Sequence, residues 1–217
     1  MAQKAAAQLE MIIAGFTVLI MATLLIFGKF ILRALFPDIE PEVMANSRIY
    51  LSISALSFVF WGFYSSGSAI LRCNEDTKTS MKISILMNVM NAVLNALFVF
   101  VVKWGVLGVA VATLISRAVA GVSMKVIISS GRNKLRADSI RLYKLTGDIV
   151  RKILSMAIPS GIENGMFQFG KLAIQSSVST LGTISIAANA MATIFEQVNG
   201  IAAMGIGIGL MTIVEQA

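Results

Sequence analysis

The amino-acid sequence predicts an all-α protein, a polytopic membrane helix bundle with six transmembrane helices. Its 217 residues are 57% hydrophobic and only 13% charged, whereas soluble domains are about 45–50% apolar and about 25% charged. The mean hydropathy is +0.82. Charge-free runs recur at a length that fits a bilayer, and most basic residues fall in loops on one side of those runs. These observations together predict a protein that crosses the membrane several times.

The first four predicted spans follow from the lengths of the uncharged runs. A helix that crosses a hydrocarbon core of about 30 Å needs roughly 20 apolar residues. Residues 11–28, 49–71 and 83–102 carry no charge, so each is predicted to cross once. A fourth span, 104–124, is interrupted only by Arg117, and Gly105 and Gly108 near its start allow a tight turn after the third span.

The last apolar stretch, 153–214, is too long for one crossing. It divides best at 180–183, where Gly and Thr weaken a helix, and this division gives spans five and six. Pro159 lies early in span five, where its missing amide donor can bend the helix. A break beside a binding site and a plain packing kink both fit this position.

Basic residues predict the orientation of the spans, because Lys and Arg near span ends remain in the cytoplasm. Twelve of the 18 Lys and Arg residues lie on one face of the predicted bundle and four on the other, which also carries Asp38, Glu40 and Glu42. Both termini of the chain are therefore predicted to be cytoplasmic. The net charge of +7 reflects cytoplasmic loops and does not indicate a nucleic-acid partner.

Residue usage excludes several chemistries. The sequence has no His, and Cys73 is its only Cys. Disulfides within the chain, Cys/His zinc sites, Ser-His triads and Cys-His dyads therefore have no residues to form them. No two carboxylates lie close together within a predicted span, so we expect neither an enzyme nor a cofactor.

One sizeable polar segment, 131–152, divides the chain into residues 1–130 with four spans and 153–217 with two. Its Leu and Ile residues recur at roughly helical spacing between basic residues, so it could lie along the membrane surface. We favour a solvated, basic cytoplasmic connector, because Asp138 and Asp148 dilute the basic face.

Polar side chains form stripes at helical spacing in three of the predicted spans. Steps of three and four residues place the members of a stripe within about 60° on one helix face. The stripes are Ser84, Asn88, Asn91 and Asn95 in the third span, Asn164, Gln168, Lys171 and Gln175 in the fifth, and Asn189, Thr193, Glu196 and Gly200 in the sixth.

Polar groups at membrane depth are costly, so three stripes together favour helices that face a shared wet cavity. Amides that only join neighbouring helices are the alternative. Glu163 and Lys171 lie two turns apart, too far for an adjacent-turn ion pair, so each is expected to have another partner or to contact water. Arg117 is interpreted as structural, with a side chain long enough to reach the interface.

Several motifs in fixed order resemble the MATE (multidrug and toxic compound extrusion) family, and the similarity covers nearly the whole chain. The first block contains the segment 71–79, the pair Asn88 and Asn91, and the segment 107–113. The second block contains the segments 158–163, 181–183 and 187–190.

The resemblance implies a two-lobed, twelve-helix transporter of the cell membrane that exports cationic or amphiphilic compounds by alternating access, in exchange for Na⁺ or H⁺. The six spans would then be the family's third to eighth, with 1–130 in the N-terminal lobe and 153–217 in the C-terminal lobe. The expected partners are the lipid bilayer, organic cations and the missing helices of the same transporter. A lipid-linked saccharide flippase of related architecture and an inactive membrane fragment are the alternatives.

The resemblance also implies site residues. Asn91, Asn95 and Thr113 match a cation site of the family, in which an Asp stands where this chain has Asn95 and another Asp comes from a span outside the chain. An amide can ligate Na⁺ but cannot carry an exchanging proton. A further acid of the family falls at Phe167 here, so the nearest carboxylate, Glu163, is expected to serve instead.

The remaining stripe residues are expected to line a substrate cavity: Asn88, Asn164, Gln168, Lys171, Gln175, Asn189 and Glu196.

Overall fold

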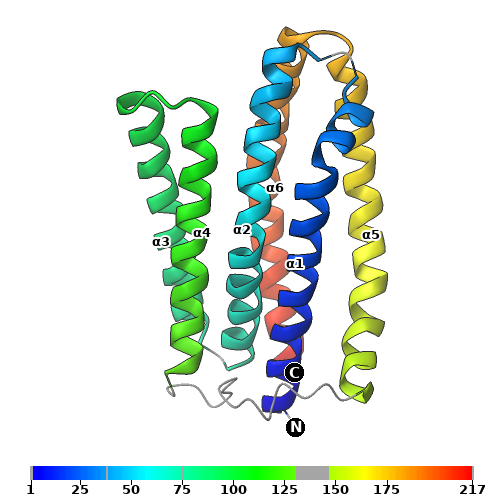
Figure 1. Cartoon of the computed structure of the whole chain (residues 1–217). Coiled ribbons are helices and arrows are strands. Elements are labelled where there is room, and N and C mark those ends of the chain that lie inside the picture. The colour runs from blue at the N-terminus through cyan, green and yellow to red at the C-terminus, as the bar shows by residue number, and fades with distance from the viewer. Residues whose placement is uncertain (1, 38, 75, 131–146, 217) are drawn as a thin grey trace. The chain divides into compact units, whose positions relative to one another are not determined.

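The structure, a computed structural model, describes residues 2–37, 39–74, 76–130 and 147–216, and these residues form helices joined by short turns (Figure 1). The helices are α1 (Ala2–Leu35), α2 (Pro41–Cys73), α3 (Thr77–Ala96), the π-helical turn η1 (Leu97–Val101), α4 (Val106–Ser129), α5 (Gly147–Ser179) and α6 (Thr183–Gln216). No strand occurs in the described part of the chain. The predicted all-α class is confirmed, and each predicted span lies on a helix.

Four helices are long and apolar enough to cross a membrane among the described residues: Lys4–Leu35, Pro41–Cys73, Thr77–Val101 and Val106–Ser129. These correspond to the first four predicted spans. The helices α5 and α6 are also long, with 33 and 34 residues, but they are not among the four.

Local sequence accounts for the helix ends. α1 ends before Pro37, and α2 begins at Pro41, a residue that is favoured in the first helical turn. Asp76 caps α3, since its Oδ1 accepts a hydrogen bond of 3.2 Å from the Thr79 amide. The predicted turn between α5 and α6 is confirmed at 180–182, where Gly182 adopts a φ of 93° that disfavours residues with a side chain.

The chain forms two compact units. The first contains Met1–Arg33 and Pro41–Ile162, and the second contains Ala34–Glu40 and Glu163–Ala217. Of the predicted connector, residues 131–146 lie outside the described residues, while 147–152 form the beginning of α5. The division into lobes at 131–152 therefore stays a prediction.

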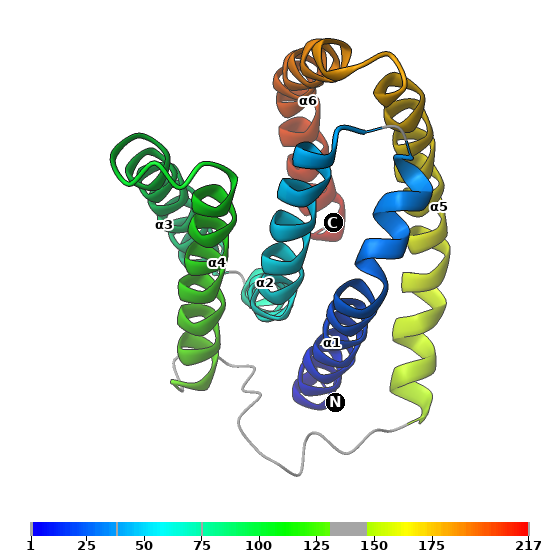
Figure 2. The ribbon, with the colours of Figure 1, turned by 45° about the horizontal axis from the view of Figure 1, so that its top comes forward.

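The core of the first unit lies where α2, α3 and α4 pack together (Figure 2). Buried Leu71, Met124 and Ile128 meet there with smaller residues. The helices α2 and α4 approach closely at Gly121, where a Cβ atom would lie 2.5 Å from the Phe60 carbonyl oxygen. Small residues allow such close approach in membrane bundles, where dispersion contacts replace the hydrophobic effect as the driving force.

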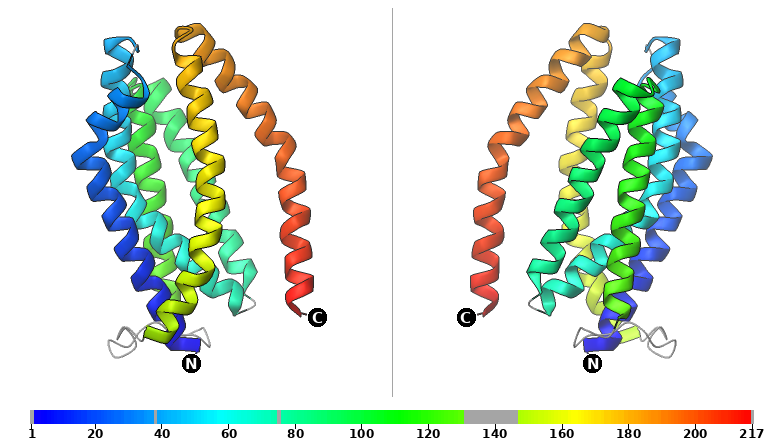
Figure 3. Two further views of the ribbon diagram at one scale, coloured as in Figure 1. Left: turned by 90° about the vertical axis from the view of Figure 1, so that its right-hand side faces the viewer. Right: turned by 90° about the vertical axis from the view of Figure 1, so that its left-hand side faces the viewer.

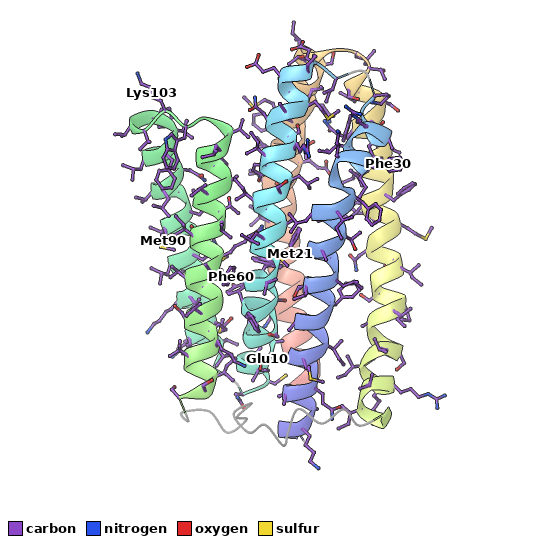
Figure 4. All side chains as sticks on the ribbon, in the orientation of Figure 1. Glu10, Met21, Phe30, Phe60, Met90 and Lys103 are labelled. Carbon is purple, nitrogen blue, oxygen red and sulfur yellow. The ribbon has the colours of Figure 1, made fainter. Side chains whose placement is uncertain are left out.

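The helix α1 begins nine residues before the predicted span, and this extension packs against α2 and α4. Ala6 and Ala7 belong to the buried cluster of the first unit. Glu10, at the end of α1 that carries the N-terminus in Figure 4, is only 4% exposed and forms an ion pair with Lys125 of α4. A buried carboxylate requires such a partner.

Arg117 of α4 contacts α2. Its Nη1 donates a hydrogen bond of 2.8 Å to Ser57 Oγ, and its guanidinium lies 5.1 Å from the centre of the Trp61 ring. The Arg117 guanidinium therefore finds its polar and aromatic partners between α4 and α2. It does not extend toward the membrane–water interface, as the sequence had suggested it could. The interpretation of Arg117 as a structural residue agrees with these contacts.

The second unit consists of residues of α5 and α6 with the linker that follows α1. The two helices meet at their turn and diverge from it with opposite chain directions (Figure 3). Hydrogen bonds attach the linker: Ser176 Oγ donates to the Leu35 carbonyl oxygen, and Thr183 Oγ1 donates to Glu40 Oε1 over 2.8 Å.

Candidate functional site

The first group of predicted site residues meets between α3 and α4. Asn95 Nδ2 donates a hydrogen bond of 3.0 Å to Asn91 Oδ1, one turn earlier on α3. Asn91 Nδ2 in turn donates over 3.4 Å to Thr113 Oγ1 on α4, and Thr113 donates to the Val109 carbonyl oxygen over 2.9 Å. We call Asn91, Asn95 and Thr113 the amide cluster.

The amide cluster contains a buried acceptor without a donor. Asn95 Oδ1 is buried and has no hydrogen-bond partner among the described residues. Leaving a buried polar group unsatisfied costs on the order of 1–3 kcal/mol, so such an oxygen indicates a place where a ligand can bind. Amide and hydroxyl oxygens are suitable ligands for a hard cation such as Na⁺. None of the three side chains ionises near neutral pH, so the cluster itself cannot exchange a proton.

The local backbone next to the amide cluster is unusual. Two residues after Asn95 the helix widens into the π-helical turn η1. Such turns are rare in proteins, and those that occur are often found at functional sites. Phe98 of this turn stacks on Trp104, with ring centres 5.3 Å apart. The sequence gives no signal for this turn, since a change of hydrogen-bond register leaves no mark in the spacing of apolar residues.

The other stripe residues of α3 do not join the amide cluster. Asn88 is exposed, and Ser84 is partly buried. Both lie on the same helix as Asn91, but the described contacts to α4 involve Asn91. The proposed role of Asn88 in a cavity stays a prediction.

The second group of predicted residues lines a groove of about 900 Å³ between α5 and α6, within the second unit. Its polar lining residues include Gln168, Lys171, Gln175, Asn189 and Glu196. The stripes predicted on these two helices therefore face one another.

Two polar pairs bridge the groove. Lys171 Nζ lies 3.5 Å from Glu196 Oε1 of α6. Of the two expectations for Lys171, another partner or contact with water, the structure shows the partner. Asn189 Nδ2 donates a hydrogen bond of 2.7 Å to Gln175 Oε1. Side chains that come from different helices thus hold the two stripes in register.

Apolar side chains complete the groove. Met166, Phe167, Leu172 and Ile174 of α5 line it beside the polar residues. The Lys171 ammonium lies 5.1 Å from the centre of the Phe167 ring, a cation–π distance. The sequence analysis did not assign these apolar residues to the cavity, because a Leu or Phe in a membrane helix contacts lipid as readily as a ligand.

Glu163 and Asn164 do not line the groove. Glu163 lies on α5 with an exposed side chain, two turns before Lys171. Its role as a cation ligand stays a prediction, and so does the role of Asn164 in the cavity.

Known proteins are similar to this chain in sequence and in fold. The sequence model of the MatE family matches residues 1–97. The probable multidrug resistance protein NorM of Thermotoga maritima is 29% identical over 189 residues, which are 85% of this chain and 40% of that protein. The N-terminal part of the chain is thus similar to the MatE family, and most of the chain is similar to this NorM protein.

Solved MATE and MOP superfamily structures have the same helical arrangement. A MOP superfamily transporter from Pyrococcus furiosus, described as having a binding pocket of reversed polarity, superposes with a TM-score of 0.81 and 21% identity. That comparison covers 94% of this chain and 45% of the other. An outward-facing multidrug resistance MATE transporter gives a TM-score of 0.74 and 22% identity over 86% and 41% of the two chains.

The chain spans about 40% of the length of its NorM relative. Its helices accordingly resemble part of the helical bundle of these solved structures. The proteins to which the chain is similar are described as a multidrug resistance protein and as transporters.

Proposed function

We propose that this chain forms part of a secondary active antiporter that exports cationic or amphiphilic compounds in exchange for a coupling ion by alternating access. The groove between α5 and α6 carries this proposal, because it combines an apolar wall with ionisable and amide side chains inside a membrane bundle. Such a surface binds amphiphilic molecules, and the two-lobed architecture of the family supplies a means of exposing it to either side.

The coupling ion that the amide cluster favours is Na⁺. Asn91, Asn95 and Thr113 offer neutral oxygens, and the buried Oδ1 of Asn95 has no donor among the described residues. A proton would need a titratable group outside the cluster, and Glu163 is the carboxylate that the sequence analysis names for this role. Na⁺ and H⁺ coupling therefore depend on different residues of the chain and can be separated by mutation.

Substitution of Asn95 tests the coupling ion. Export of two fluorescent amphiphiles, the zwitterion Nε-dansyl-lysine and the cation ethidium, is measured in membrane vesicles that contain the complete native transporter, with either a Na⁺ gradient or a pH gradient. We expect the Na⁺ gradient to drive export in the wild type and Asn95→Leu to reduce that export by about tenfold, since it removes a ligand oxygen. Asn95→Asp restores a cation ligand and adds a group that a proton can occupy.

The matched control is Asn46→Leu, which removes an amide on α2 outside the amide cluster. Wild-type export that does not depend on the Na⁺ gradient would overturn the assignment of Na⁺ as the coupling ion.

Glu163→Gln provides the complementary test. If it abolishes export driven by the pH gradient and leaves export driven by the Na⁺ gradient intact, the Glu163 carboxylate is the proton carrier. Unchanged export under both gradients would remove Glu163 from the coupling machinery.

We further propose that this chain lies in the cell membrane and that the same polypeptide supplies the helices that complete the two lobes. The apparent mass of the native product, detected in membranes with an antibody against residues 131–152, tests this. A product about twice as long as this chain supports a complete transporter. A product of 217 residues would require assembly with a partner or would leave an inactive fragment.

A further inference from the structure

The charges that line the groove between α5 and α6 balance. Among the described residues that line it, Lys171 and Glu196 are ionisable, one of each sign. Their charged atoms lie 3.5 Å apart, so the carboxylate already has a cation beside it. A ligand with a single positive charge would find no uncompensated carboxylate there and would bring an unbalanced charge into a partly apolar site, which is unfavourable.

The aromatic face that attracts cations is also occupied. The Phe167 ring has the Lys171 ammonium 5.1 Å from its centre. A ligand cation that approached this face would meet the ammonium, and like charges at that distance repel. The side of the Phe167 ring beside Lys171 is therefore suited to an apolar group and not to a second cation.

Both members of the ion pair remain accessible. The side chain of Lys171 is 40% exposed, and that of Glu196 is 66% exposed. Their separation of 3.5 Å is longer than the 2.7–2.9 Å of a strong charge-assisted hydrogen bond. The ammonium has three donors and the carboxylate about four acceptor positions, so each can bind a second group of opposite charge.

We propose that the groove takes a zwitterionic amphiphile, with the negative group of the ligand on Lys171, its positive group on Glu196, and its apolar body against the apolar wall. Such a ligand adds no net charge and satisfies both ionic groups. The amide groups of the Gln175–Asn189 pair can form hydrogen bonds with polar atoms of the ligand that lie between its two charged groups. This inference rests on the proposed export function and specifies its substrate class.

Three fluorescent probes that share one body test the charge requirement. Nε-dansyl-lysine carries a carboxylate and an ammonium, dansylcadaverine lacks the carboxylate, and dansyl-6-aminohexanoate lacks the ammonium. Binding to the complete, purified transporter is followed by the rise in dansyl emission on transfer to an apolar site. We expect Nε-dansyl-lysine to bind about tenfold more tightly than either singly charged probe, because each ionic hydrogen bond contributes a factor of this order.

Variants connect the preference to the two residues. In Lys171→Gln, Nε-dansyl-lysine should no longer bind more tightly than dansylcadaverine. The affinity for dansylcadaverine should rise, because the Lys171 ammonium no longer competes with the ligand ammonium for the Glu196 carboxylate. Glu196→Gln should remove the advantage over dansyl-6-aminohexanoate. The exchanged pair, Lys171→Glu with Glu196→Lys, should keep the preference for the zwitterion, since both charges remain in the groove. Lys78→Gln is the control, a lysine on α3 outside the groove, and should leave all three affinities unchanged.

Preferential binding of dansylcadaverine by the wild type would overturn the proposal, and so would equal changes for all three probes in Lys171→Gln. The thermal unfolding midpoint of each variant separates a change in selectivity from a loss of folding. Failure of the export proposal has a different signature, namely retained selectivity in binding without ion-driven movement of any probe into vesicles.

Discussion

At the scale of single residues, the ionised carboxyl group of Asp76 stabilises the beginning of α3. Asp76 lies between α2 and α3, outside the membrane-spanning segments, and hydrogen bonds from the Thr79 side chain and amide lower the pKa of its carboxyl group below its usual value of 3.8. The positive charge of nearby Lys82 adds to this effect. Because the folded protein binds the proton less readily than the unfolded chain, this cap stabilises the fold above the ordinary pKa and loses its effect as the pH falls through the lowered value.

Asp76→Asn should therefore change how stability depends on pH. Asn caps a helix about as well as Asp but does not titrate, so the variant and the wild type should have similar unfolding midpoints near pH 6. Below about pH 4, the wild-type midpoint should fall further than that of the variant. Thermal unfolding at a series of pH values measures the difference. Parallel curves would contradict a stabilising role for the ionised cap.

At the scale of elements, small residues fix the distance between helices. α2 and α4 approach closely at Gly121, where the atom in the way of a Cβ is the Phe60 carbonyl oxygen, part of the backbone. A side chain can move aside, but a backbone oxygen moves only with its helix. The contact between α2 and α4 therefore depends on the absence of a Cβ at this position.

Gly121→Ala should destabilise the transporter by about 1–3 kcal/mol, the usual cost of excess volume in a packed core. Gly15→Ala is the matched control, because a Cβ at Gly15 of α1 meets no atom within 4 Å. That substitution should leave stability unchanged or raise it slightly through helix propensity. The unfolding midpoint of each variant is measured by thermal denaturation in detergent. Equal midpoints for the two variants would show that α2 and α4 tolerate a wider separation.

The whole molecule has an orientation that the distribution of basic residues predicts. Cys73 is exposed at the end of α2, on the face to which the positive-inside rule assigns the cytoplasm. Lys103, at the opposite end of α3, lies in the turn before α4 (Figure 4). The two positions are therefore expected on opposite sides of the membrane.

A membrane-impermeant maleimide should modify Cys73 in inverted vesicles and not in intact cells. Mass spectrometry of the tryptic peptide 73–78 identifies the modified thiol. Lys103→Cys in a Cys73→Ser background should give the reverse result. Labelling of Cys73 in intact cells would invert the predicted topology and place both chain ends outside.

Much of the fold was predictable because its signals are local. The uncharged runs marked the first four helices, and the Gly and Thr residues at 180–183 marked the turn between α5 and α6. The spacing of polar residues also identified most members of the groove. The extension of α1 before residue 11 was missed, because charged and polar residues there resemble a solvated terminus, whereas Glu10 is buried against Lys125.

The sequence by itself determined the membrane class, the helices and the face on which each polar stripe lies, since hydropathy and helical periodicity are properties of neighbouring residues. Only the tertiary structure decided which polar groups meet. Asn91 reaches Thr113, Lys171 reaches Glu196, and Arg117 reaches Ser57. Each of these contacts joins two helices, so it depends on how far apart the helices pack and how they are rotated. Spacing within one helix carries no information about either quantity.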